Sequence, residues 1–426
     1  MQKAEKKALV YGNVLIVGVD VAKKNHYARI YNSMGIDVVK PFYFHNSREG
    51  FCRLLGKISE AKEKEKAERI IIGMEPTGHY WKPLAYFLKE AGYTVVIVNP
   101  YHVKNSKEME DNSQDKNDRK DAGLIAQLVK EGKFLHCILP EGIYAELRTL
   151  YITRQQEHKK LNAALCQLKA IVDEYFPELM EVFKSLLGKA AQWVLRNCPF
   201  PKDILSLKLE ELEEGLKQAS NSRVGIKRAL ALRQAAEKSI GVKEGLEGAK
   251  VKLQACLEEI EFYQGQIRKT EEAMGRYLEE TGLANYLLSI PGVGVVTAAG
   301  FLGEIGDPAK YQHWRQIRKL AGYNLTAQKS GKKQKAKTTI SKRGRPGLRN
   351  LLYQVSLILV AKNKEFKALY HYFLKRPENP LTRKQALVAV ALKLVRVMFT
   401  LITQKKEYDA SKVLGKYREE QLKKVA

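Results

Sequence analysis

The chain has 426 residues, with 74 Lys or Arg against 47 Asp or Glu, and a formal net charge of +27. This length suggests two or three domains of roughly 100–200 residues, and a hydrophobic share of 45% argues against disorder throughout the chain. The positive charge favours a polyanionic partner. The five scattered cysteines lack a CxxC or Cys/His zinc spacing, which argues against a disulfide framework and against structural zinc.

No segment of the sequence predicts a signal peptide or a membrane anchor. The apolar run Val14–Val19 is too short for a signal sequence and is followed by Asp20. The apolar stretch Ala386–Thr403 contains Lys393 and Arg396, so it predicts a core helix and not a membrane span. We therefore expect a cytoplasmic protein without a membrane partner.

Residues 1–140 alternate apolar β-rich runs with amphipathic segments, which predicts an α/β domain. Strands are expected at 14–19, 27–31, 38–44, 69–74 and 94–98, and helices at 47–61, 83–90 and 118–130. The first three strands are expected to form an antiparallel meander, with a turn at 32–35. Ser47 is placed to cap the first of these helices.

Four acidic residues of this domain suggest a metal site. Asp20 closes the first strand and Glu75 follows the fourth, at positions where ligand sites gather in α/β sheets. Asp118 and Asp121 are spaced i, i+3 and share one side of a helix. Such a set suits two Mg²⁺ ions, which prefer carboxylate oxygen and retain open positions for phosphate. The alternative is that each is an ordinary capping or surface acid.

Residues 141–285 carry no net charge and predict a helical, coiled-coil region. Leu253, Ile260, Ile267 and Met274 recur every seven residues, as in the seam between paired helices. Two interpretations stay open: an intermolecular contact that makes a dimer or tetramer, and a helical hairpin within one chain. Gly282 is expected to end the last helix.

Residues 286–426 carry a net charge of +21 and no acid between Asp307 and Glu365, which favours phosphate contact. Gly292 and Gly294 separate two apolar helical stretches, as in a helix-hairpin-helix that offers backbone amides to a phosphate. Ser330 lies within the densest positive charge. By residue type alone, a serine there is more often a phosphate hydrogen-bond donor than a nucleophile.

The N-terminal third contains four distinctive strings: VGVDVAKKNHYARI, GMEPTGHYWKPLAYFL, VVIVNPYHVKNSK and DNSQDKNDRKDAGLIAQL. These strings resemble the N-terminal domain of DEDD-type insertion-sequence transposases of the "one-ten" family, which includes the Piv-type DNA invertases. The resemblance implies a ribonuclease-H-like, RuvC-like fold. It also implies that Asp20, Glu75, Asp118 and Asp121 bind the divalent metal, with Asp115 a nearby competitor.

The C-terminal third resembles the second domain of the same family, through P-G-V-G, W-x-x-I-R-K-L-A-G, S-G and S-K-R-G-x-x-x-L-R. The resemblance implies that Ser330 is a nucleophile that forms a phosphoserine link to a cleaved DNA strand. Ser341 fits the S-K-x-G position, a phosphate-contacting or structural turn. The expected nucleic-acid contacts are Gly292, Gly294, Lys329, Lys332, Lys333, Lys342, Arg343, Arg345 and Arg349.

Together these features predict a prokaryotic, nucleoid-associated DNA transposase or recombinase with three parts: a RuvC-like domain (1–140), a helical coiled-coil linker that also oligomerises (141–285), and a basic transposase domain (286–426). The resemblance further implies a structured bridge RNA encoded by the element. Three alternatives stay open: a RuvC-like nuclease that uses water, a DNA invertase, and a non-catalytic nucleic-acid-binding protein.

Overall fold

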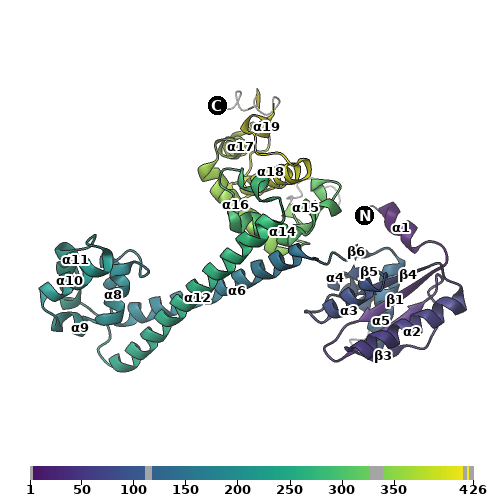
Figure 1. The fold of residues 1–426 in the computed structure, drawn as a ribbon, viewed down its shortest axis with the longest axis horizontal. Coiled ribbons are helices and arrows are strands. Elements are labelled where there is room, and N and C mark those ends of the chain that lie inside the picture. Colours follow the sequence, from purple (N-terminus) through teal and green to yellow (C-terminus); the bar gives the residue numbers. More distant parts are fainter. Residues whose placement is uncertain (1–2, 111–117, 327–338, 416–419, 422–426) are drawn as a thin grey trace. The chain divides into compact units, whose positions relative to one another are not determined.

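The computed structural model describes residues 3–110, 118–326, 339–415 and 420–421 (Figure 1). Two compact units divide the chain, Met1–Leu139 and Pro140–Ala426. Among the predicted site residues, Lys329, Ser330, Lys332 and Lys333 lie outside the described residues.

Unit 1 is built on a mixed sheet, with strand order β3-β2-β1-β4-β5-β6 over its described residues. The strands are β1 (Val14–Asp20), β2 (Asn25–Tyr31), β3 (Phe42–His45), β4 (Arg69–Met74), β5 (Thr94–Val98) and β6 (Phe134–His136). β1, β4 and β5 run parallel, while β2, β3 and β6 pair antiparallel to their neighbours. This mixed α/β arrangement fits a ribonuclease-H-like N-terminal domain.

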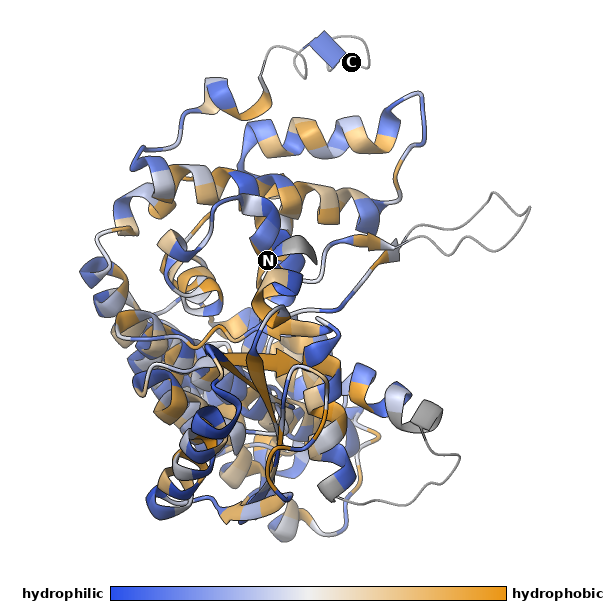
Figure 2. Ribbon diagram, turned by 90° about the vertical axis from the view of Figure 1, so that its right-hand side faces the viewer, coloured by the Kyte–Doolittle hydropathy of each residue, from blue (hydrophilic) through white to orange (hydrophobic). Residues whose placement is uncertain are grey.

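Helices cover both faces of this sheet. They are α1 (Lys3–Val10), α2 (Arg48–Glu65), α3 (Trp81–Glu90), α4 (Pro100–Glu110) and α5 (Asp118–Lys130). Leu15, Val17 and Val19 of β1 pack with α2 and α3, while Val14 and Ile16 pack with α5. Burial on both faces explains the continuous apolar run of β1, and Figure 2 shows the strands of the sheet as hydrophobic ribbons.

Most elements of unit 1 lie where the sequence predicts them, and Ser47 caps α2 by accepting a hydrogen bond from the Gly50 amide. The expected strand 38–44 is shorter, because β3 begins only at Phe42. Pro41 precedes β3, and proline lacks the amide that a paired strand needs. α4 and the three-residue strand β6 were not predicted.

Gly18 lets α5 lie directly against β1. A Cβ atom at this position would come within 2.0 Å of the Ala122 carbonyl oxygen and 2.6 Å of the Ala126 amide nitrogen. Since both neighbours are backbone atoms, a side chain here can be accommodated only by moving the helix. Gly18 therefore sets the distance between α5 and the sheet.

We expect Gly18→Ala to lower the free energy of unfolding of unit 1 by about 1–3 kcal/mol, the usual cost of overpacking a core. Gly56→Ala, in the exposed part of α2 where an added Cβ meets nothing within 4 Å, is the matched control and should be neutral or stabilising. Urea unfolding of both variants measures the difference, and equal stabilities would contradict the close approach.

Unit 2 contains a long helical hairpin made of α6 (Ile143–Tyr175) and α12 (Leu246–Glu280) (Figure 1). The helices run antiparallel, since Arg154 pairs with Glu271 and Gln167 accepts from Cys256. The heptad residues Leu253, Ile260, Ile267 and Met274 are all buried. Within one chain, the predicted seam is therefore covered by α6. As expected, α12 ends just before Gly282, whose φ is 65°.

A small helical bundle follows α6 and precedes α12. It consists of α7 (Leu179–Val182), α8 (Lys189–Asn197), α9 (Pro201–Ser206), α10 (Leu209–Ser220) and α11 (Ile226–Glu237). Their apolar side chains share one core with the adjoining parts of α6 and α12. The small bundle and the adjoining end of the hairpin are therefore packed around one common core.

The C-terminal part of unit 2 is helical, with one short β-hairpin. Its elements are α13 (Ala284–Leu288), α14 (Val295–Ile305), η1 (Pro308–Lys310), α15 (Trp314–Leu320), β7 (Leu325–Thr326), β8 (Thr339–Ile340), α16 (Pro346–Lys362), α17 (Lys364–Lys375), α18 (Arg383–Gln404) and α19 (Ala410–Leu414). Among the described helices, α18 alone is long and apolar enough to cross a membrane, and 56% of its apolar window is buried. Its buried side chains belong to the core of unit 2, as expected of a core helix.

Candidate functional site

Asp20 and Glu75 stand at the same edge of the sheet. β1 and β4 are parallel neighbours with Val19 opposite Met74, so Asp20, the last residue of β1, and Glu75, the first residue after β4, lie at the same level. Asp20 alternates with Gly18 and therefore lies on the face that α5 covers. Both acids are partly exposed. The carboxyl ends of two adjacent parallel strands thus present two carboxylates.

The first turn of α5 is directed to this same edge. Ala122 lies against Gly18, near the carboxyl end of β1. At the other end of α5, Lys130 donates to the Met34 carbonyl, which follows the far end of β2. The helix therefore runs antiparallel to β1 and begins beside Asp20. Asp121 belongs to this first turn and is partly exposed.

The backbone placement and the chemistry of these acids fit a divalent cation. Carboxylate oxygens are the ligands that Mg²⁺ prefers, and three acids occur on elements that meet at one edge. Asp118 is the first residue of α5, and its side chain lies outside the described part of the structure. Among the side chains that are described, no three Asp, Glu, His or Cys groups form a ligand cluster as they stand.

His26 fixes the turn that follows Asp20. Its ring is fully buried between Phe44 and Phe51, and Nδ1 accepts a hydrogen bond from the Ala22 amide at 3.2 Å. The proton of the neutral ring is thereby assigned to Nε2. Burial lowers the pKa of His26 below its usual 6.5, because the charged form is poorly solvated in an apolar core.

Acidification should therefore destabilise unit 1 through His26. The His26 imidazole titrates at about 6.5 in the unfolded chain and at a lower pH in the folded protein. Between these two values the unfolded state therefore binds more protons than the folded state. The stability contributed by the neutral ring is complete above 6.5 and is lost as the pH falls from there toward the folded pKa. Urea unfolding across this range should show the step in the wild type and not in His26→Gln. An identical pH dependence in both would contradict it.

Two further groups lie at this edge. Asn99 follows β5, and its side chain caps the start of α4 by accepting from the Tyr101 amide; nothing in the sequence marked it beyond its place after a strand. The segment after Glu75 turns at Gly78, with φ of 56°. His79 beyond it is exposed, while Trp81 packs on the core of unit 1.

In unit 2, β7 and β8 flank the segment that contains Ser330. Lys342 and Arg343, which follow β8, are exposed. Arg345 and Arg349 are half-buried, and their guanidinium groups donate to backbone carbonyls of the protein itself. Of the predicted phosphate contacts after β8, two are therefore exposed, whereas Arg345 and Arg349 contact the protein itself.

Gly292 and Gly294 form the turn between α13 and α14. Gly292 has a φ of 100°, a conformation that glycine adopts without strain. Gly294 is the N-cap residue of α14, without a side-chain cap, and a Cβ there would meet nothing within 4 Å. Two helices joined by a short turn are present at the place where the sequence predicts a helix-hairpin-helix, although α13 has only five residues.

Comparison with known proteins gives two family matches. Residues 17–177 match the transposase model for the DEDD domain of the IS110 type, and residues 284–371 match the IS116/IS110/IS902 transposase family. Together they cover more than half of the chain. The first spans all four acids, and the second spans Ser330 and the segment after β8.

Individual relatives agree with these matches. The protein of Streptomyces coelicolor assigned as the transposase of mini-circle IS117 is 25% identical over 334 residues, which cover 74% of this chain and 77% of the relative. The transposase for IS1111A of Coxiella burnetii is 32% identical over 34% of this chain and 41% of its own length. The pilin gene-inverting protein of Moraxella bovis is 25% identical over 30% and 38%.

The chain combines a mixed sheet that carries acids at one edge with a basic helical unit. Together with the family and relative matches, these features define an enzyme of the DNA transposase and recombinase class. Within that class, the chain belongs to the IS110 family of insertion-sequence transposases.

Proposed function

We propose that this transposase cuts and rejoins DNA strands with a DEDD metal site and a serine nucleophile. Asp20, Glu75, Asp118 and Asp121 would hold the divalent metal, taken to be two Mg²⁺ ions, and Ser330 would attack the scissile phosphate. The observation that carries the proposal is the meeting of Asp20, Glu75 and the start of α5 at one sheet edge, inside the region matched by the transposase model.

The proposed chemistry conserves the phosphodiester. The Ser330 hydroxyl oxygen bonds to phosphorus and its proton passes to solvent. The bond from phosphorus to one nucleoside oxygen breaks, and that oxygen takes a proton from solvent to become a DNA hydroxyl. A hydroxyl from the second DNA strand later attacks the phosphoserine and releases the serine. Bound divalent ions supply neutralisation of the phosphate charge. Since no bond energy is lost to water, rejoining needs no nucleotide cofactor.

Reconstitution tests this proposal. The purified chain would be mixed with two plasmids, one with the ends of the element and one with its target, in the presence and absence of the RNA transcribed from the element. We expect recombined plasmid only with RNA and a divalent metal. Recombination without RNA would remove the guide from the proposal, and cleavage without rejoining would favour a hydrolytic nuclease. DNA inversion is the second candidate outcome, favoured by the match to the pilin gene-inverting protein.

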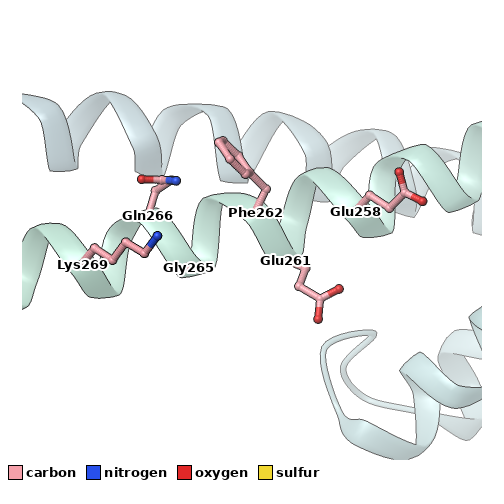
Figure 3. A pocket seen from close by; sticks show the side chains of 6 residues that line it. All are labelled: Glu258, Glu261, Phe262, Gly265, Gln266 and Lys269. Atoms are coloured by element: carbon pink, nitrogen blue, oxygen red, sulfur yellow. The ribbon is translucent and has the colours of Figure 1, made fainter.

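We propose further that the chain works as a dimer or tetramer through its helical middle, at the nucleoid in the cytoplasm of a prokaryote. Because the seam of α12 is covered by α6, such contact would use the outer surface of the hairpin. Phe262 is 58% exposed there, and Figure 3 shows its side chain rising from the same side of α12 as Gln266. The surrounding hollow is lined by Glu258, Glu261, Phe262, Gly265, Gln266 and Lys269.

A further inference from the structure

The turn after β8 is joined by backbone hydrogen bonds to the segment before β7. The Ser341 amide donates to the Asn324 carbonyl at 2.7 Å, and the Lys342 amide donates to the Gly322 carbonyl at 3.0 Å. The Ser341 hydroxyl donates to the same Gly322 oxygen. One segment immediately precedes β7 and the other immediately follows β8, so these hydrogen bonds close the base of the β7–β8 hairpin.

Two glycines make this contact possible. Gly322 has a φ of 72°, and a Cβ there would lie 2.8 Å from Arg349 Nη1 and 2.9 Å from the Lys342 carbonyl carbon. A Cβ at Gly344 would lie 2.3 Å from the Leu320 carbonyl oxygen. At both positions a Cβ would clash with backbone atoms, so the two segments approach this closely only with glycine there. The glycines of the L-A-G and S-K-R-G strings are therefore explained by backbone packing.

Arg349, which is half-buried, connects the two segments. Its Nη1 donates to the Ala321 carbonyl at 3.0 Å and to the Lys342 carbonyl at 3.2 Å. The Tyr323 hydroxyl in turn donates to the Arg349 carbonyl at 2.9 Å. One guanidinium group thus holds a carbonyl on each side of the hairpin base.

Arg345 is held by Glu304, through both its main-chain carbonyl and its carboxylate. It donates to the main-chain carbonyl of Glu304, and its Nη1 lies 3.9 Å from Glu304 Oε2. Arg148 of α6 binds that same oxygen at 3.1 Å. The Glu304 side chain is only 5% exposed, so loss of either arginine would leave a buried charge with less compensation.

Lys342 is presented outward by this framework in a strained conformation. Its φ is 53°, in the left-handed region that costs a residue with a Cβ about 1–2 kcal/mol, and it is exposed. Strain of this kind persists where the surrounding structure imposes it, and it concentrates at functional sites. Lys342 also lies in the stretch between Asp307 and Glu365, which contains no acidic residue.

We infer that Lys342 binds a backbone phosphate of the nucleic acid, and that Arg349 and the Glu304–Arg345 pair position Lys342 without binding phosphate themselves. The inference rests on the proposed function, which supplies the nucleic acid. It divides the cations after β8 by role: Lys342 contacts the ligand, while two of the arginines that follow hold the turn from which it projects.

Salt-dependent binding of a mixed-sequence DNA duplex to the full chain tests the first part. Lys342→Gly keeps the left-handed backbone without strain and removes the ammonium group. We expect the slope of log affinity against log salt to fall by about 0.9, the value for one phosphate contact, with thermal stability unchanged or raised. Lys243→Ala, an exposed lysine between α11 and α12, is the control and should keep the wild-type slope. A wild-type slope in Lys342→Gly would overturn the inference.

A double-mutant cycle tests the positioning role. If Arg349 acts through Lys342, Arg349→Met weakens binding in the wild type and has no further effect on Lys342→Gly. Additive effects would make Arg349 an independent phosphate contact and overturn its assigned role. Should Arg349→Met fail to fold, Arg349→Lys keeps the charge but not the two-carbonyl geometry. Positioning then predicts weakened binding and a reduced slope, whereas a direct phosphate contact predicts an unchanged slope.

The two proposals fail in different ways. Wild-type protein without salt-dependent DNA binding would contradict the proposed function. Wild-type protein that binds and recombines DNA, beside a Lys342→Gly variant that binds identically, would contradict this inference alone.

Discussion

Asp20→Asn should abolish DNA strand cleavage while the protein still folds and binds DNA. Asparagine has nearly the same size and removes the charge that a divalent cation needs. Asp20 is the last residue of β1 and is partly exposed, so the core of unit 1 does not depend on its ionised form. Because metal-assisted charge neutralisation supplies several kcal/mol of barrier lowering, we expect a loss of roughly a hundredfold or more in cleavage rate.

Single-turnover cleavage of a labelled DNA substrate measures this loss, with thermal unfolding and DNA binding recorded on the same preparation. Glu60→Gln is the matched control, since Glu60 is an exposed acid of α2 paired with Lys57, and it should cleave at the wild-type rate. A chelator should reproduce the loss in wild-type protein. Wild-type cleavage by Asp20→Asn would remove the acids from the mechanism.

Ser330→Ala should abolish the covalent protein–DNA adduct and strand rejoining together. Alanine removes the side-chain oxygen that we propose carries the phosphoryl group, and it leaves the acids of unit 1 unchanged. In a nucleophile-dependent transfer, such a loss is typically many orders of magnitude. We expect no adduct on a denaturing gel and no recombinant product.

Ser341→Ala is the matched control for this experiment. Its hydroxyl donates to the Gly322 carbonyl at 3.2 Å, within the turn that presents Lys342. Its loss should therefore lower stability and DNA affinity slightly, while the covalent adduct still forms at saturating protein. If Ser330→Ala cleaves at the normal rate, water is the nucleophile. The chain would then act as a hydrolytic nuclease with Ser330 as a phosphate contact.

The sheet of unit 1 was predictable because its local signals agree. β4, β5 and α5 have the bounds expected from sequence, and β1 differs from its expected run only by including Asp20. An apolar run closed by an acid shows both a buried strand and its end. β6 has only three residues, too few for periodicity to be seen, and its position depends on pairing with β5, which sequence spacing does not report.

The roles of the cations after β8 could not be read from sequence. Arg345 and Arg349 have the same residue type and the same basic neighbourhood as Arg343, yet the structure directs their guanidinium groups to carbonyls of the protein. Glu304 lies in the apolar string FLGEIG and gives no sign that two arginines converge on it. Long-range partners decide these roles, and local composition does not contain them.

Covalent attachment of Ser330 to DNA is the step that would separate the proposed reaction from hydrolysis by water. Digestion of the trapped protein–DNA adduct, followed by mass spectrometry of the peptides, tests it most directly. We expect one modified peptide, in which Ser330 carries a phosphate linked to a nucleoside, and no such peptide from Asp20→Asn. An adduct on another residue, or efficient recombination with no adduct at any time, would contradict it.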